Sequence, residues 1–157
     1  PLPEQVALVV FDFDGVLTDN RVWVDADGHE FVAAYRSDSL GIQALHRAGI
    51  RTLVLSTEKD GAVAARCRKM GVPVLQGVDD KAARLTQYLN EQGLDARAVV
   101  FVGNDINDLV CFDLVGCAVA VADAQPEVLR RADLILTRPG GHGAVRELCD
   151  LLLRRLE

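Results

Sequence analysis

The chain has 157 residues, of which 50% are apolar and only 5% aromatic, and its formal net charge is −6 at pH 7. This length allows one domain whose core is built from aliphatic side chains, as in α/β proteins with buried parallel strands. The acidic balance, without any basic block, argues against nucleic acid or an anionic membrane as a partner. The chain shows no apolar run of transmembrane length and no signal-peptide pattern. Its four cysteines form no C-x-x-C pair and predict buried thiols in a reducing cytoplasm.

Strand and helix patterns alternate along the chain, starting with the apolar run that opens it. An Asp-Gly turn signal at 27–28 predicts a hairpin between the next two short strands. Glycines that follow the helical patterns predict where helices end. The expected strands are 6–13, 21–24, 30–34, 51–56, 73–75, 98–102, 118–121 and 134–136. The expected helices are 38–48, 59–70, 80–92, 105–115, 126–131 and 144–156.

Repeated strand-then-helix units predict an α/β fold: a three-layer, Rossmann-like α/β/α arrangement around a parallel sheet, with a small β-hairpin flap. With no repeat or long linker, residues 1–157 are expected to form a single domain. Ligands of such sheets bind at the carboxyl ends of the strands. The polar residues that follow the strands are therefore expected to form one chemical set.

Two carboxylates, Asp12 and Asp14, end the first predicted strand. Strand periodicity turns them toward the same side, and ionised acids are costly to bury without a compensating cation. Gly15 allows a sharp turn, so that main-chain oxygens can also approach that cation. A hard divalent ion such as Mg²⁺, held by a few oxygens and otherwise by water and phosphate, fits this pattern.

The other strand ends add complementary groups. A hydroxyl, Ser56, follows the second core strand, Lys81 opens a later helix, and Gly-Asn-Asp-x-x-Asp follows the strand that ends at Val102. Acids and an amide can hold a metal, while a hydroxyl and a lysine can hold phosphate oxygens. One aspartate is then free to attack phosphorus, so the set indicates metal-assisted phosphoryl transfer.

Four motifs in this order resemble the haloacid dehalogenase superfamily of phosphatases: D-x-D-G-V-L-T-D at 12–19, Ser56, Lys81, and G-N-D-x-x-D at 103–108. Three further runs, at 76–78, 120–124 and 140–147, resemble its capless members. Those act on phosphates of 3-deoxy-2-keto sugar acids, such as octulosonate 8-phosphate and nononate 9-phosphate, or form phosphatase-like domains of acylneuraminate cytidylyltransferases. The resemblance implies no large cap domain and a homotetramer in which the hairpin and tail of one subunit help close another's site.

The resemblance also implies roles for the four motif residues. Asp12 matches the nucleophile, which forms an aspartyl-phosphate and binds Mg²⁺. Asp14 matches the general acid/base, and its backbone oxygen is the expected metal ligand. Ser56 and Lys81 match the groups that steady the transferring phosphoryl group.

Three positions depart from the pattern that the resemblance implies. Asn104 stands where a metal-binding aspartate is usual, so Mg²⁺ affinity should fall, or Asp105 could replace it. Glu58, after Ser56 and Thr57, stands where the octulosonate enzymes usually carry arginine, which favours the nononate branch. His142 replaces the arginine of a Gly-Gly-Arg-Gly tail. Substrate contacts are thus expected from 57, 58 and 142, and support of the metal site from Asp105 and Asp108.

Plainer interpretations exist for several of these residues. Ser56 could cap a helix, Lys81 could be solvated, Asp108 could be a first-turn acid, and the glycines at 140–143 could be a flexible link. At the level of function, the main prediction is a Mg²⁺-dependent sugar-acid phosphatase. The alternatives are a catalytically weak oligomerisation domain associated with a cytidylyltransferase, and a phosphorelay receiver. A receiver, however, carries its phosphoacceptor after a middle strand rather than in a D-x-D after the first.

Overall fold

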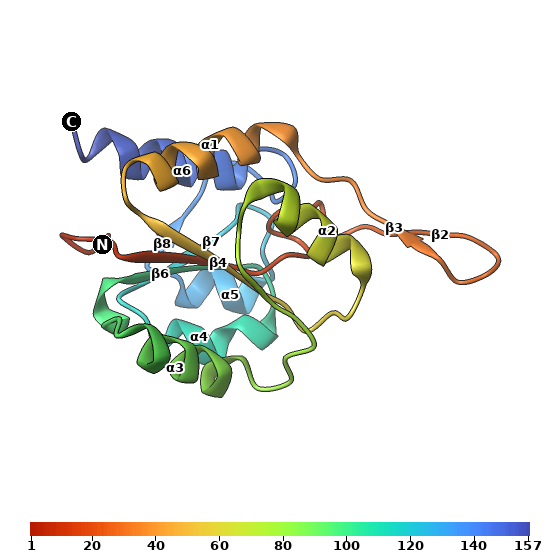
Figure 1. Cartoon of the computed structure of the whole chain (residues 1–157), viewed down its shortest axis with the longest axis horizontal. Helices are drawn as coiled ribbons and strands as arrows, with labels where there is room; N and C mark the ends of the chain where they lie inside the picture. Colours follow the sequence, from red (N-terminus) through yellow and green to blue (C-terminus); the bar gives the residue numbers. More distant parts are fainter.

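Residues 1–157 are described by a computed structural model. Six parallel strands form one sheet in the order β5-β4-β1-β6-β7-β8. Helices lie above and below this sheet, which gives three layers (Figure 1). The strands are β1 (Leu8–Phe11), β4 (Arg51–Leu55), β5 (Val74–Leu75), β6 (Val99–Gly103), β7 (Cys117–Ala120) and β8 (Leu134–Ile135). The predicted α/β class is confirmed.

The helices divide between the two faces of the sheet. In Figure 1, α1 and α6 lie on one face, while α3, α4 and α5 lie on the other. Helix α1 packs along α6 and also contacts α2. The helices are α1 (Arg36–Arg47), α2 (Gly61–Met70), α3 (Lys81–Gln92), α4 (Leu109–Phe112), α5 (Pro126–Arg131) and α6 (Ala144–Arg154), with 3-10 turns at Ala96–Ala98 and Ile106–Asp108. None of them is both long and apolar enough to cross a bilayer.

Burial explains why the central strands read as continuous apolar runs. All residues of β1, β6 and β7 are buried, because helices cover both faces of the sheet. The four cysteines are buried free thiols within this core, as predicted. The core thereby fixes the carboxyl ends of β1, β4 and β6 side by side.

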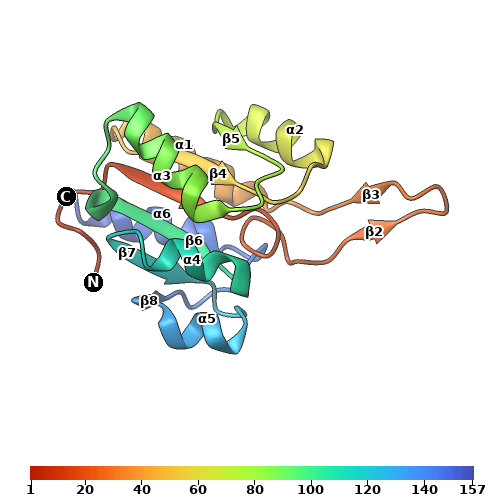
Figure 2. The ribbon, with the colours of Figure 1, turned by 90° about the horizontal axis from the view of Figure 1, so that it is seen from below.

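A two-stranded hairpin, β2 (Trp23–Val24) and β3 (Glu30–Phe31), is the predicted flap. It projects from the body at the end opposite the two chain termini (Figures 1 and 2). No separate cap domain is present. The hairpin strands are shorter than the predicted 21–24 and 30–34, because their side chains are exposed and no second layer packs on them.

One predicted helix is not continuous in the structure. Residues 105–115 form a 3-10 turn, Ile106–Asp108, followed by the short α4 rather than one continuous helix. The Asp105 and Asp108 side chains accept backbone N–H groups at the start of this segment in a capping box. Helix α2 begins at Gly61 instead of residue 59, because Asp60 caps it by accepting the Ala62 N–H at 2.7 Å.

Candidate active site

The loop after β1 carries the first part of the site. Asp12 follows β1 and donates its backbone N–H to Val102 O of β6, which holds the loop against the neighbouring strand. Gly15 then turns the chain with φ +85°, and a Cβ there would lie 1.9 Å from the Asn104 Nδ2 atom. Only glycine fits this turn, both for its left-handed backbone and for its contact with Asn104.

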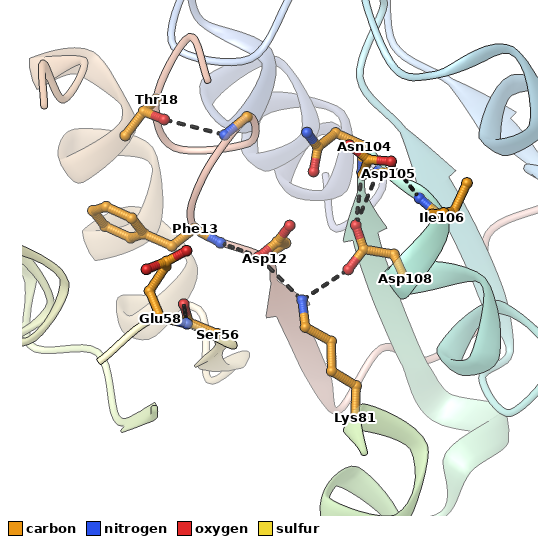
Figure 3. A network of polar contacts seen from close by, with 11 residues as sticks. Asp12, Phe13, Thr18, Ser56, Glu58, Lys81, Asn104, Asp105, Ile106 and Asp108 are labelled. Atoms are coloured by element: carbon orange, nitrogen blue, oxygen red, sulfur yellow. Dashed lines mark hydrogen bonds and ion pairs between the residues drawn. The ribbon is translucent and has the colours of Figure 1, made fainter. Parts of the chain in front are cut away.

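A buried ion-pair network joins three elements at this edge of the sheet (Figure 3). Lys81, at the start of α3, has its Nζ atom 3.1 Å from Asp12 Oδ1 and 2.9 Å from Asp108 Oδ1. The lysine side chain is only 1% exposed, so the interpretation as a solvated lysine is wrong. Asp12 Oδ1 also accepts the Phe13 N–H at 2.7 Å. The nucleophile candidate is therefore oriented by two donors.

Burial and charge shift the pKa values of this network. Burial raises the pKa of Asp12 to about 7, the charge of Asp108 adds to the shift, and Lys81 opposes it. Burial alone would lower the pKa of Lys81, but the carboxylates of Asp12 and Asp108 outweigh it and raise that pKa. Two acids thus share one buried cation, and a further cation beside Asp12 would favour its ionised form.

Asn104 lies beside the other Asp12 oxygen, Oδ2, where such a cation could bind. One terminal atom of its amide lies 2.9 Å from Asp12 Oδ2 and 3.1 Å from Asp14 O. As NH₂, this group donates a hydrogen bond to each oxygen. As the carbonyl oxygen, it makes a set of three oxygens that repel one another unless a cation lies among them. Oxygen donors of this kind are those that Mg²⁺ prefers, so the residues present fit the expected metal.

Asp105 and Asp108 hold the backbone around Asn104 in place through hydrogen bonds. Asp108 Oδ2 accepts the N–H groups of Asn104 at 2.9 Å and Asp105 at 3.2 Å. Asp105 Oδ1 accepts the Ile106 N–H at 2.7 Å and is engaged in capping that turn. Asp108 is an acid of the first turn, as the plainer interpretation has it, and it is also fully buried in the ion-pair network.

The segment after β4 adds a hydroxyl and two exposed residues. Ser56 is buried, and its Oγ atom accepts the Glu58 N–H at 3.1 Å, which leaves the hydroxyl hydrogen free to donate. Because Asp60 caps α2, the interpretation of Ser56 as the helix cap is wrong. Thr57 and Glu58 are exposed, and Glu58 lies on the side of Asp12 that is opposite Asn104 (Figure 3).

The tail loop before α6 packs tightly on the loop after β1. A Cβ at Gly140 would lie 1.8 Å from Gly15 O, so this glycine permits a close backbone approach and is not merely a flexible link. His142 is exposed and lies near Asp19: the Arg21 N–H is the main cause that lowers the pKa of Asp19, and the charge of His142 contributes. His142 does not line the pocket beside Asp14.

That pocket has a volume of about 210 Å³. It lies between the hairpin and the carboxyl edge of the sheet that carries Asp12, Asp14, Lys81 and Asp108 (the catalytic edge). Burial raises the pKa of Asp14, and the charges of Glu58, Asp60 and Glu30 raise it further. A raised pKa suits a group that must donate a proton. Glu30 and Asp60 were not predicted here from the sequence, because neither belongs to a motif. The lining residues are Phe13, Asp14, Asn20, Arg21, Val22, Glu30, Val32, Glu58, Asp60, Ala62 and Val63.

Comparison with known proteins decides the family. Residues 64–148 match the model of the haloacid dehalogenase-like hydrolases. The chain is 36% identical over 151 residues to the 3-deoxy-D-manno-octulosonate 8-phosphate phosphatase of Escherichia coli K12, covering 96% of this chain and 80% of that protein. The chain belongs to the haloacid dehalogenase-like hydrolase family. The predicted enzyme class is confirmed, and the alternative of a phosphorelay receiver is not retained.

Further similarities agree with this family. A haloacid dehalogenase family hydrolase from Streptomyces avermitilis is 51% identical, with a TM-score of 0.92 over 96% of this chain and 86% of that one. The octulosonate 8-phosphate phosphatase of Moraxella catarrhalis, solved with magnesium, phosphate and KDO, is 31% identical, with a TM-score of 0.92 over 96% and 87%. N-acylneuraminate cytidylyltransferase A of Danio rerio is 33% identical over 153 residues, covering 96% of this hydrolase and 36% of that protein.

Proposed function

We propose that this hydrolase is a Mg²⁺-dependent phosphomonoesterase that acts on a phosphorylated 3-deoxy-2-keto sugar acid through an aspartyl-phosphate. The observation that carries the proposal is the Asp12 carboxylate, held by Lys81 on one oxygen and facing Asn104 and the Asp14 carbonyl with the other. This is an oriented nucleophile beside a place for a cation. The printed activities of the relatives in Escherichia coli and Moraxella catarrhalis support the choice of substrate class.

In the first step, an Asp12 oxygen attacks phosphorus and forms a P–O bond while the bond from phosphorus to the sugar oxygen breaks. The electron pair stays on the sugar oxygen, which takes a proton from Asp14. In the second step, water attacks phosphorus, gives a proton to Asp14, and releases phosphate and the Asp12 carboxylate. The Ser56 hydroxyl and the Lys81 ammonium stabilise the phosphoryl oxygens in both steps.

Asp12 Oδ2, Asp14 O and the Asn104 carbonyl would hold the metal. A bound Mg²⁺ supplies positive charge that offsets the repulsion between the phosphate dianion and the Asp12 carboxylate. Because Asn104 brings no charge to the set, the affinity for Mg²⁺ should be lower than with a second carboxylate in its place.

Within the substrate class, we favour a nononate 9-phosphate over octulosonate 8-phosphate. Glu58 lines the pocket that receives the leaving group, beside Asp14. The carboxylate there can accept hydrogen bonds from sugar hydroxyls, whereas an arginine would donate them. We assign Thr57 and His142 to the outer rim of the site, where both are exposed.

We propose a homotetramer whose hairpins pack on neighbouring subunits. The hairpin exposes Val22, Trp23, Val24 and Phe31, and Trp23 is 75% exposed. A two-stranded hairpin is weakly stable alone, and an apolar patch of this kind marks an interaction surface. The four free buried thiols support a place in the reducing cytoplasm.

A second candidate is a weakly active oligomerisation domain of the kind found with cytidylyltransferases. The similarity to the protein from Danio rerio favours it. The buried network of Asp12, Lys81 and Asp108 favours catalysis instead, because a domain without activity has no need to bury three charges.

Phosphate release tests the proposal directly. Octulosonate 8-phosphate, nononate 9-phosphate and p-nitrophenyl phosphate are each supplied with Mg²⁺, and in parallel with EDTA. We expect Mg²⁺-dependent release, with the largest kcat/KM for the nononate. No release from any of the three would favour the oligomerisation domain, and a larger kcat/KM for the octulosonate would remove the preference assigned to Glu58.

A further inference from the structure

The pocket beside Asp14 is strongly acidic for a site that receives an anionic substrate. Five charged side chains line it, of which four are acids, Asp14, Glu30, Glu58 and Asp60, and one is Arg21. Arg21 does little to offset them, because its Nε atom pairs with Asp19 Oδ2 at 3.1 Å and its side chain is 83% exposed. The part of the substrate that becomes the leaving group therefore lies among acidic side chains.

These acids form no group of three whose ligand atoms all lie close together. The one group of three acidic, histidine or cysteine side chains whose ligand atoms lie within 4.8 Å of one another is Asp25, Asp27 and His29, at the exposed tip of the hairpin. Glu30, Glu58 and Asp60 are not such a group, and they line the pocket together with Asp14. An ionised carboxylate only accepts hydrogen bonds, so each of them calls for an O–H or N–H group on the ligand.

We propose that Glu30, Glu58 and Asp60 make the enzyme select leaving groups that carry hydroxyl or amino groups, and no anionic group, next to the phosphate. This inference rests on the proposed function, because it takes the phosphate to lie at Asp12 and the leaving group to pass Asp14. Hydroxyls on the carbons near the phosphate then donate to the three acids. A carboxylate at the same place is rejected by like charge and by the absence of donors.

This selection by the three acids determines which end of a sugar-acid substrate lies in the pocket. An 8- or 9-phosphate of such an acid has its phosphate at one end and its carboxylate on carbon 1 at the other, with hydroxylated carbons next to the phosphate. Only that hydroxylated part fits beside Glu30 and Asp60, so the carboxylate must lie outside the acidic pocket. Glu30, in hairpin strand β3, and Asp60, the cap of α2, are therefore specificity residues.

Two small phosphates of equal carbon number test the rule. Glycerol 3-phosphate and 3-phosphoglycerate differ in having CH₂OH or a carboxylate at the far carbon. With Mg²⁺ and constant ionic strength, the wild-type enzyme should prefer glycerol 3-phosphate by about tenfold or more in kcat/KM. The double variant Glu30→Gln/Asp60→Asn should reduce that ratio by about fivefold or more, mainly by lowering KM for 3-phosphoglycerate. Both amides keep the shape of the acids, and the amide at position 60 keeps an oxygen for the Ala62 N–H.

The matched control is Asp25→Asn/Asp27→Asn, which removes the same charge from the exposed hairpin tip. It should leave the ratio within about twofold of wild type, because the tip does not line the pocket. Size-exclusion chromatography checks that both double variants keep the assembly of the wild type. An unchanged ratio in the pocket variant, or an equal change in the tip variant, overturns the inference.

Failure of the proposed function would look different, since no phosphate would be released from either probe or from a sugar-acid phosphate. In that case, the affinities of the enzyme for the two probes still test the inference. Calorimetry on the Mg²⁺-loaded Asp12→Asn variant gives the Kd for each probe. We expect tighter binding of glycerol 3-phosphate and a smaller difference after Glu30→Gln/Asp60→Asn. Equal Kd values for the two probes would overturn the selection rule.

Discussion

Two buried carboxylates, Asp108 at the catalytic edge and Asp38 in α1, have opposite surroundings. Asp108 accepts the Lys81 ammonium on one oxygen and two backbone N–H groups on the other. Asp38 accepts only the Arg146 N–H at 3.0 Å, and its Oδ2 atom is buried without a partner. Loops at the sheet edge can direct several donors at one acid, whereas two packed helices offer a single free N–H at the start of α6.

The protein surrounds its buried acids with donors at the catalytic edge, and it does not do so between α1 and α6. At the catalytic edge, Asp108 meets the Lys81 ammonium and two backbone N–H groups, while Asp12, whose pKa burial raises to about 7, shares the same ammonium and lies beside the place for a further cation. Between α1 and α6, burial raises the pKa of Asp38 to about 7, although Arg146 and Arg66 oppose the shift. Asp38 is therefore set to act as a neutral hydrogen-bonding group through part of the physiological range.

The largest expected effect comes from removing the nucleophile while keeping its shape. Asp12→Asn should lower kcat by about 10³-fold or more, because the amide does not attack phosphorus. The fold should persist, since an amide oxygen can still accept the Phe13 N–H. Phosphate release with Mg²⁺ measures the loss, and circular dichroism checks the fold. Turnover within about tenfold of wild type would remove Asp12 from the nucleophile role.

Removing Lys81, the cation that Asp12 and Asp108 share, should strongly destabilise the fold. Lys81→Met leaves Asp12 and Asp108 buried without their counterion, which should lower the free energy of unfolding by about 3–5 kcal/mol. Urea unfolding in EDTA measures it. Arg131→Met is the matched control, because it breaks the exposed pair with Asp113 at 2.7 Å and should cost less than about 1 kcal/mol. Equal losses in the two variants would contradict the special position of Lys81.

Sequence and structure agree best at the catalytic edge, because motif order there follows strand order. A strand end fixes where its next residue lies, so Asp12, Ser56 and Asn104 could be placed together from the chain alone. The burial of Lys81 could not be derived from composition, since its partner Asp108 is 27 residues away. Only the motif order pointed to it.

Outside the catalytic edge, several features of the structure have no local signal in the sequence. Asp38 meets the Arg146 N–H from 108 residues away, and nothing in the local pattern of α1 distinguishes it from a first-turn acid. The predicted helix 105–115 was too long, because hydrophobic spacing does not show that Asp105 and Asp108 are used as caps. Glu30 and Asp60 line one pocket only because the tertiary fold brings β3 and the start of α2 to the same place.

A third prediction concerns the metal position. Asn104→Asp replaces an amide that can donate to Asp12 Oδ2 and Asp14 O by a carboxylate that repels them. In EDTA, the variant should lose about 1–3 kcal/mol of unfolding free energy. With Mg²⁺ the order should reverse in part, because a second carboxylate ligand binds the ion more tightly, by about tenfold in Kd. Thermal unfolding against Mg²⁺ concentration measures both effects.

The control for this prediction is Asp105→Asn, at the neighbouring acid that is engaged in capping the turn. It should change the Mg²⁺ concentration dependence by less than about twofold. A weaker response to Mg²⁺ in Asp105→Asn than in wild type, together with no change in Asn104→Asp, would assign the ligand to Asp105 instead.

The smallest effect is expected at Asp38, and it should depend on pH. Because the folded pKa is about 7 and the ordinary value is 3.8, the unfolded chain releases this proton first as the pH rises. The contribution of Asp38 to stability is therefore full below about pH 4, falls between about pH 4 and 7, and stays low above that range. Asp38→Asn cannot ionise and keeps an oxygen for the Arg146 N–H.

The variant Asp38→Asn should thus match wild type at pH 4.5 and exceed it at pH 8, by about 1–3 kcal/mol in the free energy of unfolding. Urea unfolding at the two pH values, in EDTA, gives the difference, and the raised pKa of Asp12 cancels because both proteins contain it. Asp150→Asn, on the exposed side of α6 beside Arg146, is the control and should show no such pH dependence. A gain at pH 4.5 equal to that at pH 8 would mean that Asp38 stays ionised in the fold, and the contrast with Asp108 would then lie in partners alone.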